Sequence, residues 1–170
     1  MAKKKIDLGM IATLCAAVLG VIAIIMLALP AIANKLSTDT VYSGWDVAFG
    51  LTEKATVGGA TISREIFKFS FMNVLTYLLV IAGIACTVLN YLGKGGKYMN
   101  LIATVTFLLA GIFFFLVIPF SMPNVGGEAT IEEIAELKEE FFKLGAGAII
   151  GGICSILAAV ASGYKAFIAK

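Results

Sequence analysis

Residues 8–34 read LGMIATLCAAVLGVIAIIMLALPAIAN, an apolar run that contains no charged side chain. A helix needs about 20 apolar residues to cross the roughly 30 Å hydrocarbon core of a bilayer, and this run is longer than that. Three more uncharged runs of comparable length follow along the chain: Phe69 to Gly93, Tyr98 to Gly127 and Leu144 to Tyr164. The sequence therefore predicts four membrane-spanning helices.

The composition supports the membrane class for the whole chain. Of its 170 residues, 60% are hydrophobic and only 14% are charged, whereas soluble domains contain about 25% charged residues. We predict a mainly α membrane protein: a four-helix transmembrane bundle with a small extracellular β-hairpin or sheet, forming a single domain over residues 1–170. The predicted segments are spans at 8–33, 70–92, 99–120 and 144–164, external loops at 34–69 and 121–143, and a cytoplasmic turn at 93–98.

Lysine residues near the ends of the runs predict the orientation in the membrane. Lys and Arg favour the cytoplasmic side, and seven Lys residues flank the runs at one end of the predicted bundle. They are Lys3, Lys4, Lys5, Lys94, Lys97, Lys165 and Lys170. In the two other connections, acidic residues outnumber basic ones. We therefore expect a multi-pass protein of the plasma membrane with both termini in the cytoplasm.

The chain offers no pattern of residues typical of a catalytic or metal site. It has no His, and no charged residue lies within the runs, where such a residue usually marks an ion path or a catalytic centre. Cys15, Cys86 and Cys154 lie in apolar runs without CxxC spacing, which favours packing roles over redox chemistry. We expect a protein that is not an enzyme and binds no cofactor, metal ion or nucleic acid.

Small residues at four-residue spacing predict close helix packing on the first and last spans. Such spacing lets two helix backbones approach closely in lipid. It occurs at Ala12, Ala16 and Gly20, and again at Gly147 and Gly151, beside which lies Gly152. The pattern fits packing within the bundle as well as association between subunits, so the expected partners are membrane lipids and either a second copy or another membrane protein.

The first external loop alternates apolar and polar residues from Trp45 to Val57, which predicts a β-strand. Gly58 and Gly59 suit the two-residue turn of a hairpin. That turn would place the charged pair Glu53 and Arg64 opposite each other, a favourable cross-strand contact. The other predicted pairs are Val57 with Ala60, Thr56 with Thr61, Ala55 with Ile62 and Leu51 with Ile66.

The second external loop contains a predicted amphipathic helix over residues 130–143. Thr130 and Glu133 have the spacing of a capping box, and apolar residues from Ile131 onward recur on one side. The other side is acidic. We interpret it as a solvated face, with cation binding and attraction of a basic partner as alternatives.

This layout resembles the claudin-like tetraspan group: four spans, both ends inside, and a long first external loop that is β-rich and contains Trp. Proteins of that group have several Trp residues and a disulfide in the loop, whereas here the match is limited to Ser43-Gly44-Trp45, and the loop has no Cys. A first external loop without a disulfide favours a bacterial relative of this architecture. The resemblance implies a role in adhesion, in a barrier or as an auxiliary subunit, with no catalysis.

Our functional hypothesis is a membrane scaffold, adhesion protein or accessory subunit that recognises a partner or itself through its extracellular cap. The candidate contact residues are Trp45, Val47 and Phe49. The alternative is an oligomeric pore or channel subunit, whose lumen would have to be lined by Thr, Asn and Ser side chains. An enzyme acting on lipids or quinones is a third possibility.

Overall fold

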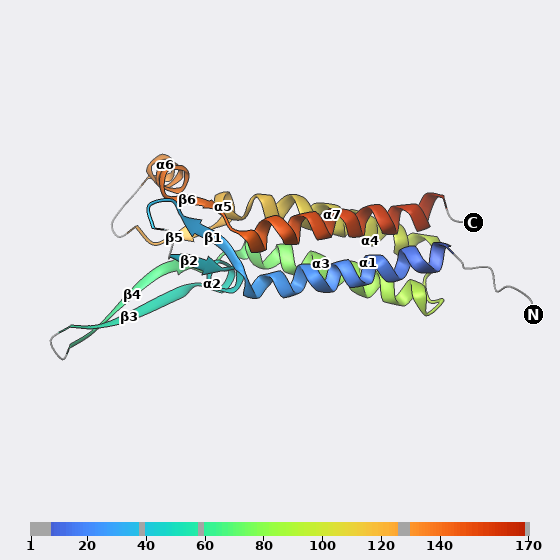
Figure 1. The fold of residues 1–170 in the computed structure, drawn as a ribbon, viewed down its shortest axis with the longest axis horizontal. Coiled ribbons are helices and arrows are strands. Elements are labelled where there is room, and N and C mark those ends of the chain that lie inside the picture. Colours follow the sequence, from blue (N-terminus) through green and yellow to red (C-terminus); the bar gives the residue numbers. More distant parts are fainter. Residues whose placement is uncertain (1–7, 38–39, 58–59, 126–129, 169–170) are drawn as a thin grey trace, which may run out of the picture.

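The computed structural model describes residues 8–37, 40–57, 60–125 and 130–168. Figure 1 shows an elongated bundle of four long helices with a cap of short strands and helices at one end. The beginning of α1 and the end of α7 lie together at the other end of the bundle. This arrangement confirms the predicted fold class of a four-helix bundle with a small sheet.

Each of the four long helices in the described residues is long and apolar enough to cross a membrane. Neighbours contact one another in the cyclic order α1, α3, α4, α7, and α7 closes the ring against α1. The helices are α1 (Leu8–Ile25), α3 (Phe71–Tyr91), α4 (Gly96–Phe115) and α7 (Ala146–Phe167). The protein is therefore a multi-pass membrane protein with a tetraspan layout.

Two proline residues explain why two of the helices end before the predicted ends of their spans. Proline removes the hydrogen bond to the carbonyl four residues earlier and clashes with it. Pro30 does this to Met26, and the first helix gives way to a short 3-10 turn, η1 (Met26–Ala28), instead of continuing to residue 33. Pro119 does the same to Phe115, where α4 ends, and a separate single turn follows as α5 (Val117–Phe120).

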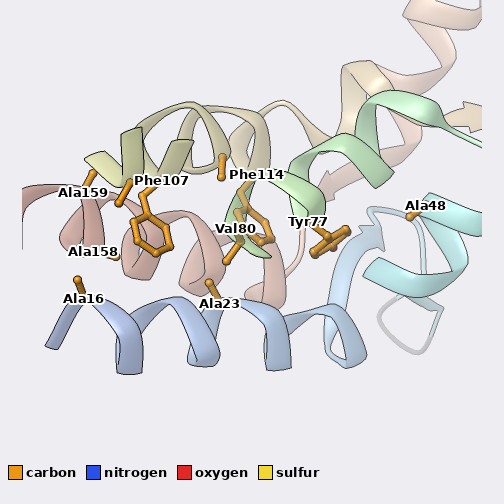
Figure 2. Close-up of a cluster of buried hydrophobic side chains, with 11 residues drawn as sticks. Ala16, Ala23, Ala48, Tyr77, Val80, Phe107, Phe114, Ala158 and Ala159 are labelled. Atoms are coloured by element: carbon orange, nitrogen blue, oxygen red, sulfur yellow. The ribbon is translucent and has the colours of Figure 1, made fainter. Parts of the chain in front are cut away.

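Aromatic side chains from α4 fill the centre of the bundle. Figure 2 shows Phe107 and Phe114 pointing from α4 into the space between the helices. Both are buried, and Phe107 packs where Gly20 and Gly83 leave room on α1 and α3. Phe114 meets Tyr77 edge-on at a centroid distance of 5.4 Å. The absence of a side chain at Gly20 and Gly83 thus leaves space for the aromatic ring of Phe107.

One three-stranded sheet in the cap joins the first and last spans. Its strand order is β2 (Val41–Ser43), β1 (Pro30–Asn34), β6 (Phe142–Leu144), and both pairings are antiparallel. The chain passes from α1 through η1 into β1, and from β6 through Gly145 into α7. The sheet therefore fixes the cap ends of α1 and α7 relative to each other.

The predicted strand from Trp45 to Val57 is wrong over its first half, which forms helix α2 (Gly44–Phe49). Ser43 caps this helix, because its side chain accepts a hydrogen bond from the Asp46 amide and the Asp46 carboxylate accepts one from the Ser43 amide. This reciprocal capping favours a helix start over an extended chain. Gly50, with a φ of 95°, then ends the helix.

The hairpin itself is confirmed, with β3 (Leu51–Val57) antiparallel to β4 (Ala60–Lys68). Glu53 lies opposite Arg64, and the other predicted pairs are found except that Leu51 faces Phe67 and not Ile66. An irregularity in the register between Leu51 and Thr52 causes that shift. The base of the hairpin also pairs with β5 (Met122–Pro123). The predicted turn at Gly58 and Gly59 lies outside the described residues.

The predicted amphipathic helix is present as α6 (Ile131–Phe141), with the Thr130 and Glu133 capping box formed. It does not continue into the last span, because β6 and Gly145 separate the two helices. A second hydrophobic core lies in the cap, between the sheets, α2, α5 and the start of α7. In it, the ring of Phe67 lies 4.9 Å from that of Tyr42 and 5.7 Å from that of Phe142.

Candidate interaction surfaces at the cap

Trp45 and Phe49 form an exposed aromatic pair on α2. They are one helical turn apart, and their ring centroids lie 4.3 Å from each other at an interplanar angle of 35°. Trp45 is 56% exposed and Phe49 is 43% exposed. Two large rings that contact each other at the surface offer a preformed apolar patch, which is typical of interaction sites.

Val47, the third residue predicted to contact a partner, is fully buried. The prediction assumed a strand, in which residues 45, 47 and 49 share one face. In a helix, residue 47 turns away from 45 and 49, and here it enters the cap core beside Ile32 and Phe67. The side chain of Val47 is therefore not accessible to a partner.

The helix that carries the aromatic pair is held firmly at both ends. The Gly44 amide donates to the Leu29 carbonyl at 3.2 Å, and the Ala48 carbonyl accepts from the Ser70 amide at 3.0 Å. Gly44 also lies against the Tyr77 hydroxyl, where there is no space for a side chain. These contacts tie α2 to Leu29, which follows η1, and to the start of α3, so the bundle fixes the position of the helix that carries the two exposed rings.

More exposed aromatic residues lie at the start of α3. Phe69 is 54% exposed and Phe71 is 61% exposed, and the backbone of Phe69 lies close to Gly50 at the end of α2. The exposed apolar surface at the cap end of the bundle therefore includes the start of α3 as well as α2.

A cleft of about 550 Å³ lies between α6 and the ends of α3 and α5. Its walls are largely apolar, and they carry the charged residues Lys68 and Lys138. The Lys138 ammonium donates a 3.0 Å hydrogen bond to the Pro119 carbonyl, in the single turn of α5. Burial lowers the pKa of Lys138. The other lining residues are Met72, Phe120, Ser121, Met122, Pro123, Ile131, Ile134 and Ala135.

The sequence did not point to this cleft, because its walls come from three separate segments: 68–72, 119–123 and 131–138. The only available signal was the periodicity of α6, in which residues 131, 134, 135 and 138 fall on one face. In the sequence, the acidic face of α6 is the more conspicuous feature. Within the described parts of the chain, no three Asp, Glu, Cys or His side chains are close enough to hold a metal ion.

The predicted helix-packing residues lie mainly in contacts between the spans of one chain. Ala16, Gly20, Gly147, Gly151 and Gly152 are buried, whereas Ala12 is half-buried. A side chain at Gly151 would meet Phe114, and one at Gly152 would meet Phe115. In the described structure Gly151 and Gly152 therefore lie at contacts within the bundle, and association between subunits stays a prediction.

Polar groups in the spans mostly hydrogen-bond to their own helices. The hydroxyls of Thr13 and Thr87 each donate to the carbonyl four residues earlier, at 2.8 and 2.7 Å. Ser155 and Ser162, both on α7, have buried hydroxyls without a hydrogen-bond partner in the described structure. Cys15 is exposed, and Cys86 and Cys154 are half-buried.

No family model matches this sequence, and no curated protein or solved structure matches it.

Proposed function

We propose that this protein is a non-enzymatic membrane scaffold, adhesion protein or accessory subunit, and that its cap binds a membrane-protein partner or a second copy through Trp45 and Phe49. The observation that carries the proposal is the exposed aromatic pair on α2. Both rings lie outside the two buried cores of the chain, although α2 is capped and tied to the bundle.

The layout adds support of a more general kind. Four spans with a β-containing cap resemble the claudin-like architecture, whose members act through contacts between cap surfaces and helix faces. In this proposal the cap lies outside the cell, the protein resides in the plasma membrane of a bacterium, and both termini face the cytoplasm, as the lysine distribution indicates.

The test compares complexes of the wild-type protein with those of the double variant Trp45→Ala and Phe49→Ala. Membranes are solubilised in a mild detergent after chemical crosslinking, and complex size is measured on a native gel. We expect the double variant to lose the larger complexes while its amount in the membrane stays the same, because exposed rings contribute little to the fold.

Tyr98→Ala is the matched control. Tyr98 is 79% exposed and belongs to the first turn of α4, a helix that begins at the end of the bundle opposite the cap. This variant should keep the wild-type complexes. Unchanged complexes in the double variant, or equal losses in both variants, would contradict the proposal.

The pore alternative has less support from the packing. Phe107 and Phe114 fill the centre of the bundle, so a lumen would have to form between several copies. Such a lumen needs polar outward faces on the spans, and many of the exposed span residues are apolar, including Leu14, Val18, Ile81 and Ile153. Reproducible conductance after reconstitution would favour the pore over the scaffold.

A further inference from the structure

The charge of the cleft beside α6 differs from that of the helix as a whole. Helix α6 is acidic, but its residues that line the cleft are Ile131, Ile134, Ala135 and Lys138. Its Glu residues lie at other positions around the helix. Lys68 at the end of β4 adds a second positive charge. Among the lining residues both charges are therefore positive, which suits an anionic ligand.

The position of the cleft indicates where such a ligand would come from. Met72 belongs to the first turn of α3, and Phe120 is the last residue of α5. Both lie where the spans enter the cap, the level at which hydrocarbon gives way to lipid headgroups. Met122 is 52% exposed and Ile131 is 87% exposed, so the rim of the cleft is apolar. An apolar rim at this level is accessible to an acyl chain.

We propose that this cleft binds an anionic phospholipid. The acyl chain lies along the apolar wall formed by α6, α5 and Met72, and the phosphate contacts the ammonium groups of Lys68 and Lys138. The Lys138 ammonium has three donors, and its bond to Pro119 uses one of them. A volume of about 550 Å³ is within the range of small-molecule sites, roughly 300–1,000 Å³, and accommodates the headgroup region with part of one chain. This proposal is independent of any contact made by Trp45.

The test measures lipid binding to the purified full-length protein by native mass spectrometry. Phosphatidylglycerol and phosphatidylcholine with identical acyl chains are titrated separately. We expect wild-type protein to bind phosphatidylglycerol about tenfold more tightly, because each Lys near a membrane surface contributes to the attraction of anionic lipid. In the double variant Lys68→Gln and Lys138→Gln this preference should disappear.

Two further variants test whether the lipid preference depends on the cleft itself. One controls for the loss of positive charge, and the other controls for unfolding of the cap. Lys54→Gln with Lys143→Gln removes the same charge from exposed positions of the cap outside the cleft and should keep the tenfold preference. Ala135→Trp fills the cleft without changing its charge and should abolish tight phosphatidylglycerol binding. It provides the decisive measurement if the loss of the bond from Lys138 to Pro119 unfolds the cap.

The proposal is overturned if wild-type protein binds both lipids equally. It is also overturned if the Lys54 and Lys143 variant loses the preference as fully as the cleft variant, or if Ala135→Trp binds phosphatidylglycerol like the wild type. An excess of inorganic phosphate distinguishes a lipid site from a phosphate site. Failure to displace the lipid supports the proposal, and full displacement contradicts it.

Discussion

At the scale of single residues, glycine positions set how closely the spans pack. A β-carbon at Gly147 would lie 2.9 Å from three backbone oxygens, those of Met26, Leu29 and Pro30. Backbone atoms cannot move aside as the end of a flexible side chain can. Gly163, on the same helix, faces only Thr104, at 3.5 Å, which is an ordinary contact distance.

We therefore predict opposite effects for the same substitution at these two sites. Gly147→Ala should lower the free energy of unfolding by about 1–3 kcal/mol, because overpacking forces α7 away from η1 and the start of β1. Gly163→Ala should leave it unchanged or raise it by up to about 1 kcal/mol, since Ala favours helix more than Gly does. Unfolding with a denaturing detergent, followed by circular dichroism, measures both, and equal effects would contradict the packing argument.

Trp45 allows a second prediction, because it is the only Trp in the chain and its fluorescence reports on one site. If Trp45 contacts a protein partner, brominated lipids should quench its emission weakly in assembled complexes and strongly in dissociated protein. A ring that simply anchors the cap in the membrane surface would be quenched to the same extent in both. The measurement thus separates partner contact from the interfacial role of aromatic residues.

The role of a residue could be predicted where it followed from the spacing of nearby residues in the sequence. Glu53 and Arg64 were paired correctly, because a predicted two-residue turn sets the register of the strand residues next to it. The pairing of Leu51 was wrong, because the register shifts between Leu51 and Thr52. The four-residue spacing of Gly147 and Gly151 in the sequence predicts that Gly147 lies in a helix contact. By contrast, nothing near Lys138 in the sequence reveals that it contacts Pro119, because that contact depends on how α6 folds back over α5.

At the scale of elements, α6 is stabilised at its start by the Thr130 and Glu133 capping box. Thr130→Ala should cost the helix about 1 kcal/mol and raise amide hydrogen exchange in its first two turns about fivefold. Exchange in α3, a long helix outside this loop, should stay unchanged. Equal exchange of α6 in the variant and the wild type would contradict the role of the cap.

The same capping box predicts a pH response. Hydrogen bonds from the Thr130 amide and hydroxyl lower the pKa of Glu133 below its usual value. The stabilisation is therefore present above the unfolded pKa, near 4.3, and it is lost as the pH falls through the lower folded pKa. Exchange in α6, corrected for intrinsic rates, should rise over that acidic range. Glu133→Gln should lack this response, whereas Glu140→Gln, a change away from the capping box, should retain it.

Element types followed from the sequence where an uncharged apolar run was long, as in the four spans, and where apolar residues recurred at helical spacing, as in α6. Prediction failed where short local signals competed with that pattern. Residues 45–49 alternate like a strand, yet the capping pair of Ser43 and Asp46 makes them helical. The strand β1 was assigned to the first span because its residues are apolar. Only Pro30 marks the change, and β1 becomes a strand by pairing with β6, far away in the sequence.

At the scale of the whole molecule, the hairpin and the turn between α3 and α4 lie at opposite ends of the bundle. We predict that Lys54→Cys reacts with a membrane-impermeant maleimide in intact cells, and that Lys94→Cys reacts only after permeabilisation. The protein without either change controls for labelling of Cys15, Cys86 and Cys154. The opposite pattern would place the cap, with its aromatic pair, in the cytoplasm.

The pairing of β1 with β6 also has a consequence for how the chain is made. A ribosome completes β1 early, but β6 emerges roughly 110 residues later, a delay on the order of ten seconds at typical translation speeds. Until then the central strand of this sheet lacks one neighbour. The cap thus matures only after β6 has been made, and a chain terminated before β6 would display an open strand edge that quality-control proteases and chaperones can recognise.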